Sequence, residues 1–178
     1  MTAPVSLRTI LRADFDHFLR LCNRREGAGL WRIWLNPRTL PVALIRLVGR
    51  MEQRGLSVLA TLLRLLILWW FRVEIPSKVV IGAGFVLPHP GGIVLGAASI
   101  GENVVVFQNV TLGARYFDGQ FDLQTRPVIG DNVTIGVGAV VLGPVTIGKG
   151  ATVAANSLVI RDVAAGATAM GVPSHSNV

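Results

Sequence analysis

The sequence predicts a mainly β protein in which a parallel β-helix of triangular coils follows an α-helical segment. Three observations predict this fold class. Aliphatic residues recur every six positions in the second part of the chain, glycines follow many of them, and the first 72 residues carry a helical period instead. We therefore expect an N-terminal helical segment over residues 1–72 and a β-helix domain over residues 73–178.

The six-residue repeat is the strongest of these signals, because fixed self-similarity indicates stacked units. Six residues suit one short strand with one tight corner, and three such units make a triangular coil whose inward aliphatic side chains form a continuous column. A β-sandwich would show turns about every 8–12 residues instead. The expected inward residues are Ile81, Leu87, Ile93, Ile100, Val106, Leu112, Ile129, Ile135, Val141, Ile147, Val153 and Val159.

The repeat stops between Leu112 and Ile129, where the chain reads GARYFDGQFDLQTRPV. A regular stack cannot absorb such a segment, so we expect a projecting loop over residues 113–128. Long loops on a regular scaffold often carry function.

Helices are predicted before residue 73. In LRTILRADFDHFLRLC the apolar residues fall three and four positions apart, and NPRTLP at residues 36–41 should break the chain before a second helix in VALIRLVGRMEQRG. The run LSVLATLLRLLILWWF, residues 56–71, has sixteen residues and contains Arg64. A spanning helix needs about twenty apolar residues, so a buried or interfacial helix is expected.

The net charge of +7 comes entirely from the helical segment, which holds twelve arginines against two Asp and two Glu. These arginines lie among Leu, Ile and Trp rather than with glycines and aromatics, so nucleic-acid binding is not expected. The pattern suits peripheral contact with anionic lipids, and equally a solvated basic face. Both interpretations stay open.

Cysteine usage bears on the compartment. Cys22 is the one cysteine of the chain, which excludes an internal disulfide framework and a Cys-based metal cluster. The first residues do not form a signal peptide, because Asp14 and Asp16 interrupt the region where an apolar core would continue. We expect a cytoplasmic protein, with contact at the inner face of the membrane as the open alternative.

Three stretches carry a resemblance to a known family: VEIPSKVVIGAGFVLPHPGGIVLG at residues 73–96, IGENVVVFQNVTLG at 100–113 and RPVIGDNVTIGVGAVVLG at 126–143. They resemble the hexapeptide-repeat acyltransferases, and among these the serine acetyltransferase group, over nearly the whole chain. The resemblance implies a left-handed parallel β-helix, acetyl-CoA as co-substrate without a metal, and a homotrimer or a larger assembly.

The resemblance places the family's catalytic histidine on His89 and its paired carboxylate on Glu74. Histidine suits a general base because it titrates near neutral pH. Glu74 would hold the other ring N–H and stabilise the imidazolium. With Cys22 in the helical segment, we expect direct acetyl transfer rather than an acyl-enzyme.

Coenzyme A in this family lies along the coil, between subunits, against backbone and small residues. The resemblance therefore implies a cofactor-binding set on this chain. Its members are Ala114, Val137, Thr152 and Ala155, with Lys149 as a partner for phosphate.

The acceptor site departs from the serine-specific pattern at Pro88, Thr125 and Arg126, where the group has an aspartate and an Arg-His pair. Without that aspartate, the ammonium group of serine would lose its partner in a closed site, which costs several kcal/mol. We therefore expect a sugar hydroxyl of a polysaccharide or its precursor as the acceptor, bound by these three positions, as in the exopolysaccharide members of the family.

Three other functions are weighed against this one. Serine O-acetylation in cysteine biosynthesis is the first alternative. A non-catalytic β-helix scaffold at a membrane is the second. A carbonic-anhydrase-type metal enzyme would need three convergent histidines, whereas His89 is the one histidine in the regular coil, so a metal site is not expected.

Overall fold

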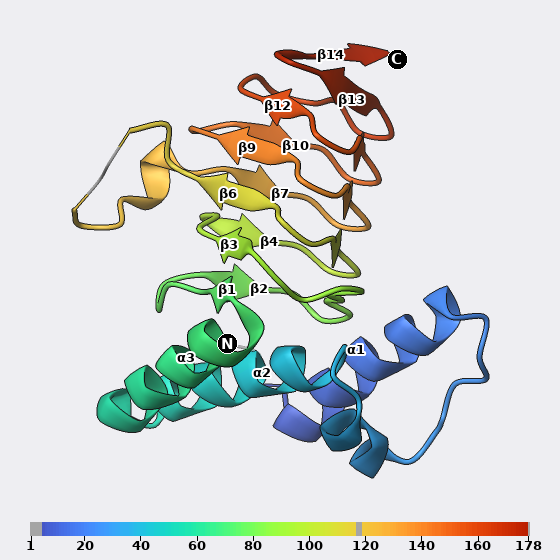
Figure 1. Ribbon diagram of the computed structural model, residues 1–178, viewed down its shortest axis with the longest axis vertical. Coiled ribbons are helices and arrows are strands. Elements are labelled where there is room, and N and C mark those ends of the chain that lie inside the picture. Colours follow the sequence, from blue (N-terminus) through green and yellow to red (C-terminus); the bar gives the residue numbers. More distant parts are fainter. Residues whose placement is uncertain (1–4, 117–118, 178) are drawn as a thin grey trace.

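The chain begins with helices in the computed structural model, which describes residues 5–116 and 119–177 (Figure 1). The Ser6 hydroxyl accepts a hydrogen bond from the Thr9 N–H at 3.1 Å and caps the first helix. The helices, in order, are α1 (Leu7–Leu21), the 3₁₀ helix η1 (Leu30–Leu35), α2 (Leu40–Gln53) and α3 (Ser57–Phe71).

Helix α2 begins inside the segment that was expected to break the chain. It starts at Leu40, with Pro41 in its first turn. Proline is tolerated there because the first N–H groups of a helix have no helical partner in any case. The break is therefore shorter than the NPRTLP motif indicates.

Parallel strands follow directly after α3 and form three sheets, and up to β13 successive strands lie in different sheets. The orders are β1-β3-β6-β9-β12, β2-β4-β7-β10 and β5-β8-β11-β13-β14, and β14 alone pairs antiparallel. The strands are β1 (Val73–Glu74), β2 (Val80–Ile81), β3 (Ile93–Leu95), β4 (Ser99–Ile100), β5 (Val105–Val106), β6 (Thr111–Gly113), β7 (Val128–Ile129), β8 (Thr134–Ile135), β9 (Val140–Leu142), β10 (Thr146–Ile147), β11 (Thr152–Val153), β12 (Leu158–Val159), β13 (Thr168–Gly171) and β14 (Ser174–Asn177).

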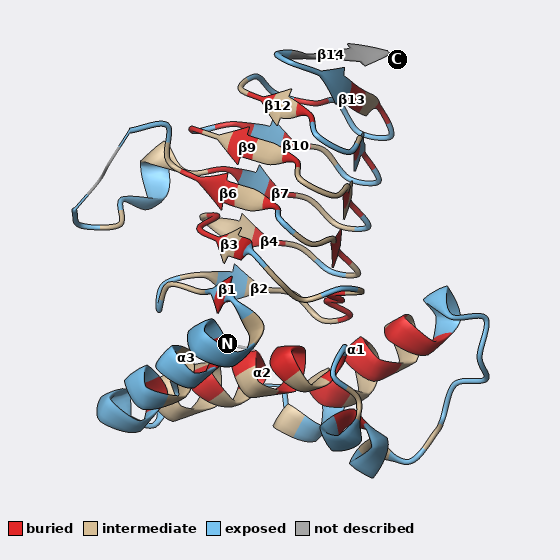
Figure 2. Ribbon diagram, viewed as in Figure 1, coloured by how far each residue is buried: buried red, intermediate tan, exposed pale blue. Residues whose placement is uncertain are grey.

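The six-residue repeat is confirmed as the core of these coils. Eleven of the twelve expected inward residues are at most 2% exposed, and Ile81, in the first coil, is partly buried. Figure 2 shows this interior as a buried column running up the stack. Burial of about twelve aliphatic side chains supplies a large apolar stabilisation, so the coil holds itself together from within.

The segment between β6 and β7 leaves the stack and projects from it (Figure 1). It contains the short 3₁₀ helix η2 (Leu123–Thr125). Two arginines tie its ends to the coil: Arg115 donates to the Ile160 carbonyl at 3.0 Å, and Arg126 donates to the Gly96 carbonyl at 3.0 Å.

A buried ion pair joins the helical segment to the first coil. Arg46 of α2 binds Asp14 of α1 through two hydrogen bonds of 2.9 Å. The same guanidinium donates to the carbonyls of Ile81 and Gly82, and Asp14 accepts the Phe85 N–H at 2.9 Å. Each charge is thus both paired and hydrogen-bonded, which buried charges require.

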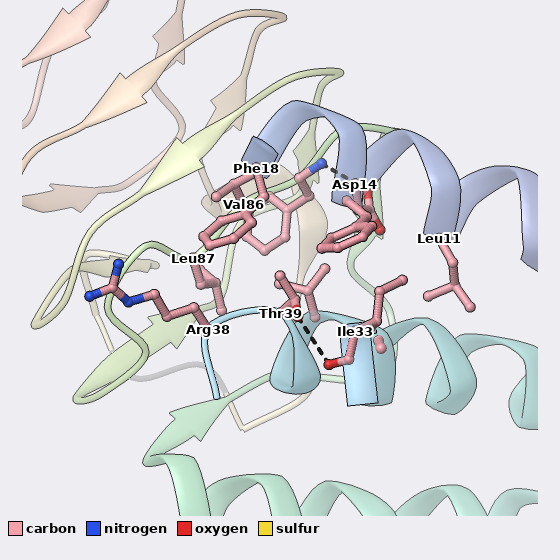
Figure 3. A pocket seen from close by; sticks show the side chains of 12 residues that line it. Leu11, Asp14, Phe18, Ile33, Arg38, Thr39, Val86 and Leu87 are labelled. Atoms are coloured by element: carbon pink, nitrogen blue, oxygen red, sulfur yellow. Dashed lines mark hydrogen bonds between the residues drawn. The ribbon is translucent and has the colours of Figure 1, made fainter. Parts of the chain in front are cut away.

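Apart from this ion pair and a hydrogen bond between His17 Nδ1 and the Gly84 carbonyl, the seam is apolar packing (Figure 3). Phe15 and Phe18 of α1 meet Val86 and Leu87 of the first coil. They leave a cavity of about 10 Å³, enough for roughly one water molecule. This cavity therefore reflects packing between the two regions and is too small for a substrate.

Helix α3 is buried on one side only. Ala60 and Ile67 are fully buried, whereas most other side chains of α3 face outward (Figure 2). The single chain therefore leaves most of α3 exposed, and the buried or interfacial location expected for residues 56–71 stays a prediction. Among the described residues, no helix combines the length and the apolar character needed to cross a membrane.

Candidate active site

His89 lies at the corner that leads from the first coil into β3. The corner, residues 87–92, is shaped by two prolines and by Gly92, which has a φ of 64°. A Cβ on Gly92 would lie 2.4 Å from Asn109 Oδ1, so only glycine fits this left-handed, crowded position. The result is an exposed imidazole on a rigid turn.

This corner is longer than its counterpart in the next coil. Eight positions separate Val86 from Val94, but only six separate their partners Val105 and Thr111. Because of these two extra residues, Leu95, rather than Ile93, pairs with Leu112. The period hid this insertion because Ile93 is itself aliphatic and buried.

A surface hollow of about 490 Å³ lies beside His89. It is lined by Pro90, Gly91, Gly92, Arg72, Gln108 and Asn109. Backbone hydrogen bonds fix both sides of the hollow. The Gly91 carbonyl accepts the Asn109 N–H at 2.9 Å, and the Arg72 carbonyl accepts the Ile93 N–H at 3.0 Å.

Three polar side chains of this hollow were not predicted: those of Arg72, Gln108 and Asn109. Arg72 ends α3 in the left-handed conformation, with a φ of 54°, and the Gln108 Oε1 atom is buried without a hydrogen-bond partner among the described residues. A buried, unpaired amide oxygen next to a hollow is costly unless a ligand satisfies it. Aligning the repeats corner by corner would have placed Gln108 beside PHPGG.

Glu74 lies on the outer surface of β1, opposite Val94. Its carboxylate is exposed and does not line the hollow. Within residues 5–116 and 119–177, no hydrogen bond joins Glu74 to His89. Catalytic hydrogen bonds are often longer before substrate binds, so the pairing of the two stays a prediction.

Two of the predicted coenzyme-binding residues lie above His89 on the same edge of the coil. Gly138 N–H donates to the Gln108 carbonyl at 3.0 Å, and Asn156 N–H donates to the Val137 carbonyl at 2.8 Å. These bonds stack the corners that contain Val137 and Ala155 over the His89 corner. With coils about 4.8 Å apart, the two lie roughly 10 and 14 Å along the edge from the histidine corner.

The other three coenzyme candidates lie elsewhere. Thr152 is exposed in β11, on the sheet next to this edge, and Lys149 is exposed at the corner that precedes this strand, between β10 and β11. Ala114 comes directly after β6, at the base of the projecting loop.

The predicted acceptor residues are divided between two corners. Pro88 precedes His89, but Thr125 and Arg126 lie in the projecting loop, which leaves the coil at the corner after the β1 sheet. There Arg126 contacts the Gly96 carbonyl, and its guanidinium lies 3.6 Å from the centre of the Phe121 ring. Within a single chain, Arg126 and His89 therefore lie at different corners of the coil.

Comparison with known proteins identifies the family of this chain. A family model described as bacterial transferase hexapeptide, six repeats, matches residues 126–161. A serine acetyltransferase of Mycobacterium tuberculosis is 36% identical over 169 residues, which cover 93% of this chain and 71% of that protein. A serine acetyltransferase of Bacillus pumilus is 36% identical over 147 residues, but the chain spans only 62% of its length.

Solved structures give the same result. The serine acetyltransferase of Neisseria gonorrhoeae superposes with a TM-score of 0.82 at 28% identity, covering 97% of this chain and 66% of that one. A soybean serine acetyltransferase complexed with serine has a TM-score of 0.82 at 35% identity, covering 97% and 70%. The expected left-handed parallel β-helix with N-terminal helices is thereby confirmed, and the chain belongs to the serine acetyltransferase family of hexapeptide-repeat proteins.

Proposed function

We propose that this protein transfers the acetyl group of acetyl-CoA to the hydroxyl oxygen of a small acceptor. The observation that carries the proposal is the position of His89, on a rigid corner beside an open hollow and below Val137 and Ala155 on one edge of the coil. That edge offers backbone and small side chains along which an extended thioester can lie, with its acyl end at the histidine.

In this mechanism a ring nitrogen of His89 takes the acceptor's hydroxyl proton while the hydroxyl oxygen attacks the thioester carbonyl carbon. The tetrahedral intermediate collapses as the C–S bond breaks, and the imidazolium returns the proton to the leaving thiolate. The products are the acetyl ester and free coenzyme A. Glu74 holds the second ring N–H, and Gln108 positions the acceptor or the thioester through its amide.

L-Serine is the acceptor that the comparisons favour, because the relatives and structures described above are serine acetyltransferases. They do not support the carbohydrate acceptor that was expected from the sequence. Serine therefore becomes the first candidate.

A sugar hydroxyl remains the second candidate, on one specific observation. The residues that line the hollow include no carboxylate among those described, and their one permanent charge is the cation of Arg72. An ammonium group would meet no counter-charge there, whereas a neutral acceptor needs none and an anionic acceptor would pair with Arg72.

A homotrimer would explain why the candidate residues occupy different corners. Packed side by side, three coils place the projecting loop of one subunit, with Thr125 and Arg126, near the His89 edge of the next. A mixed-subunit experiment tests this arrangement. Trimers assembled from His89→Ala and Arg126→Ala chains should recover part of the activity that each variant lacks alone, and no recovery would mean that the two residues serve separate sites.

The function itself is tested by acetyl-CoA turnover with L-serine, free sugars, nucleotide sugars and lipid-linked oligosaccharides as acceptors. His89→Ala should lower kcat by about 10² to 10⁴ with the best acceptor. His175→Ala, in β14, is the matched control. Turnover with sugars but not with serine would reverse the order of the two acceptors, and no transfer to any of them would support the scaffold alternative.

A further inference from the structure

We propose that helix α3 docks the protein onto an anionic lipid surface, lying parallel to the membrane. The inference rests on the surface of the helical segment and does not depend on acetyl transfer. The docking surface, here called the α3 face, consists of the exposed apolar residues Val58, Leu59, Leu62, Leu65, Leu66, Leu68, Trp69 and Trp70.

The α3 face is continuous. Val58, Leu62, Leu65 and Trp69 follow one another at spacings of four, three and four residues, which places them on one line along a helix. Trp69 and Trp70 are 83% and 81% exposed. Soluble proteins rarely expose large apolar patches that have no partner.

The one charged residue within α3 is turned away from this face. Arg64 forms an ion pair with Glu52 of α2 and also donates to the Thr61 hydroxyl at 3.1 Å. In the sequence, Arg64 interrupts the apolar run. In the folded chain it binds back toward α2, so the outward surface stays apolar.

The helical segment carries a large excess of unpaired positive charge. All four carboxylates of the helical segment, Asp14, Asp16, Glu26 and Glu52, are used in ion pairs with four arginines. Eight of its twelve arginines have no carboxylate partner in the described part of the chain. They are Arg8, Arg24, Arg25, Arg32, Arg38, Arg50, Arg54 and Arg72.

The arrangement of these charges selects a lipid surface over a second copy of the chain. Arg50 and Arg54 precede α3, and Arg72 follows it, so cations flank both ends of the apolar face. A second copy would bring the same uncompensated arginines together, which is unfavourable. Anionic headgroups pair with them while the bilayer takes up the leucines, and tryptophan prefers this interfacial depth.

The length of α3 sets its orientation. Its 15 residues rise about 22 Å, less than the roughly 30 Å hydrocarbon core of a bilayer. The buried Ala60 and Ile67 also keep the opposite side of α3 against the protein. The helix therefore lies in the interface with one face inserted.

Co-sedimentation of the full chain with vesicles tests the proposal. One arm uses phosphatidylcholine alone, and the other includes about 30% phosphatidylglycerol, which supplies the negative surface potential. The protein should sediment with the anionic vesicles, and high salt should weaken this binding about tenfold or more, because headgroup attraction is screened. Failure to bind the anionic vesicles would overturn the proposal.

Two matched variants separate local insertion from net charge. Trp69→Glu and Val172→Glu each place one carboxylate at an exposed apolar position, but Val172 lies beyond β13, in the last coil. Trp69→Glu should lower partitioning at least about tenfold through loss of apolar insertion, and Val172→Glu should change it little. Equal losses in both variants would contradict docking through α3.

Two further measurements complete the test. Brominated acyl chains should quench the tryptophan fluorescence of the unaltered protein, and Trp69→Phe/Trp70→Phe should bind but lose most of this quenching. Analytical ultracentrifugation without lipid addresses the second-copy alternative. A lower assembly mass for Trp69→Glu, without vesicle binding by the unaltered protein, would show that another copy covers the α3 face.

Discussion

The coil and helix α3 orient the same kind of side chain in opposite directions. In the coil the aliphatic residues point inward, and most are almost inaccessible to water. In α3 only Ala60 and Ile67 are fully buried, while leucines and tryptophans face outward. The coil is therefore stabilised by its own stacking, whereas α3 leaves apolar surface that requires a partner outside the chain.

The largest expected effect comes from breaking the ion pair that joins the two regions. Asp14→Ala leaves the Arg46 guanidinium buried without its carboxylate, which should cost about 3–5 kcal/mol. All four tryptophans lie in the helical segment, so urea unfolding followed by tryptophan fluorescence reports on that segment. The fluorescence transition should separate from the circular-dichroism transition of the coil.

Asp16→Ala provides the control for this experiment. Asp16 pairs with Arg12 at 3.7 Å nearer the surface, and its loss should cost about 1 kcal/mol or less. Similar shifts for the two aspartate variants would mean that the buried pair does not hold the regions together.

The second prediction compares burial directly. Ile135→Ala opens a cavity in the fully buried column and should lower the free energy of unfolding by about 2–5 kcal/mol. Leu62→Ala, on the α3 face, should change it by about 0.5 kcal/mol or less, since the side chain is half exposed and alanine favours helix. A large loss from Leu62→Ala without lipid would indicate that the face is already covered.

A smaller effect is expected at the His89 corner. Gly92→Ala combines a left-handed φ with a close approach to Asn109 Oδ1, and should cost about 2 kcal/mol. Gly150→Ala has a φ of 70° but open space around it, so it should cost about 1 kcal/mol from strain alone. The rate of the proposed acetyl transfer should decrease in Gly92→Ala but not in Gly150→Ala. Equal decreases in both variants would mean that Gly92 has no specific role in the site.

The smallest effect is stabilising. Gly49 lies inside α2, and a Cβ there would meet no atom within 4 Å. Gly49→Ala should therefore raise the free energy of unfolding by about 0.5–1 kcal/mol, through helix propensity. Thermal unfolding monitored at 222 nm measures it, and a destabilised variant would indicate a neighbour at Gly49 in the assembled protein.

Much of the fold follows from the sequence, because a six-residue period is local and repeats many times. One insertion in a corner does not erase it: Ile93 is buried as expected, although Leu95 is the residue that pairs with Leu112. The break predicted over NPRTLP is longer than the observed one, because proline stops a helix in its interior but not in its first turn. His89 became a candidate through its motif, and the structure places it on the edge of the coil that also carries Val137 and Ala155.

By itself, the sequence determined the coil, its inward column and the two-part organisation of the chain, because short-range periodicity encodes them. Only the tertiary structure decided which groups meet across long separations. It brought Arg72 and Gln108 to the hollow beside His89, kept Arg126 at another corner, and paired Arg64 with Glu52 so that α3 presents an uninterrupted apolar face. Those outcomes depend on packing between distant segments, which no local pattern of residues records.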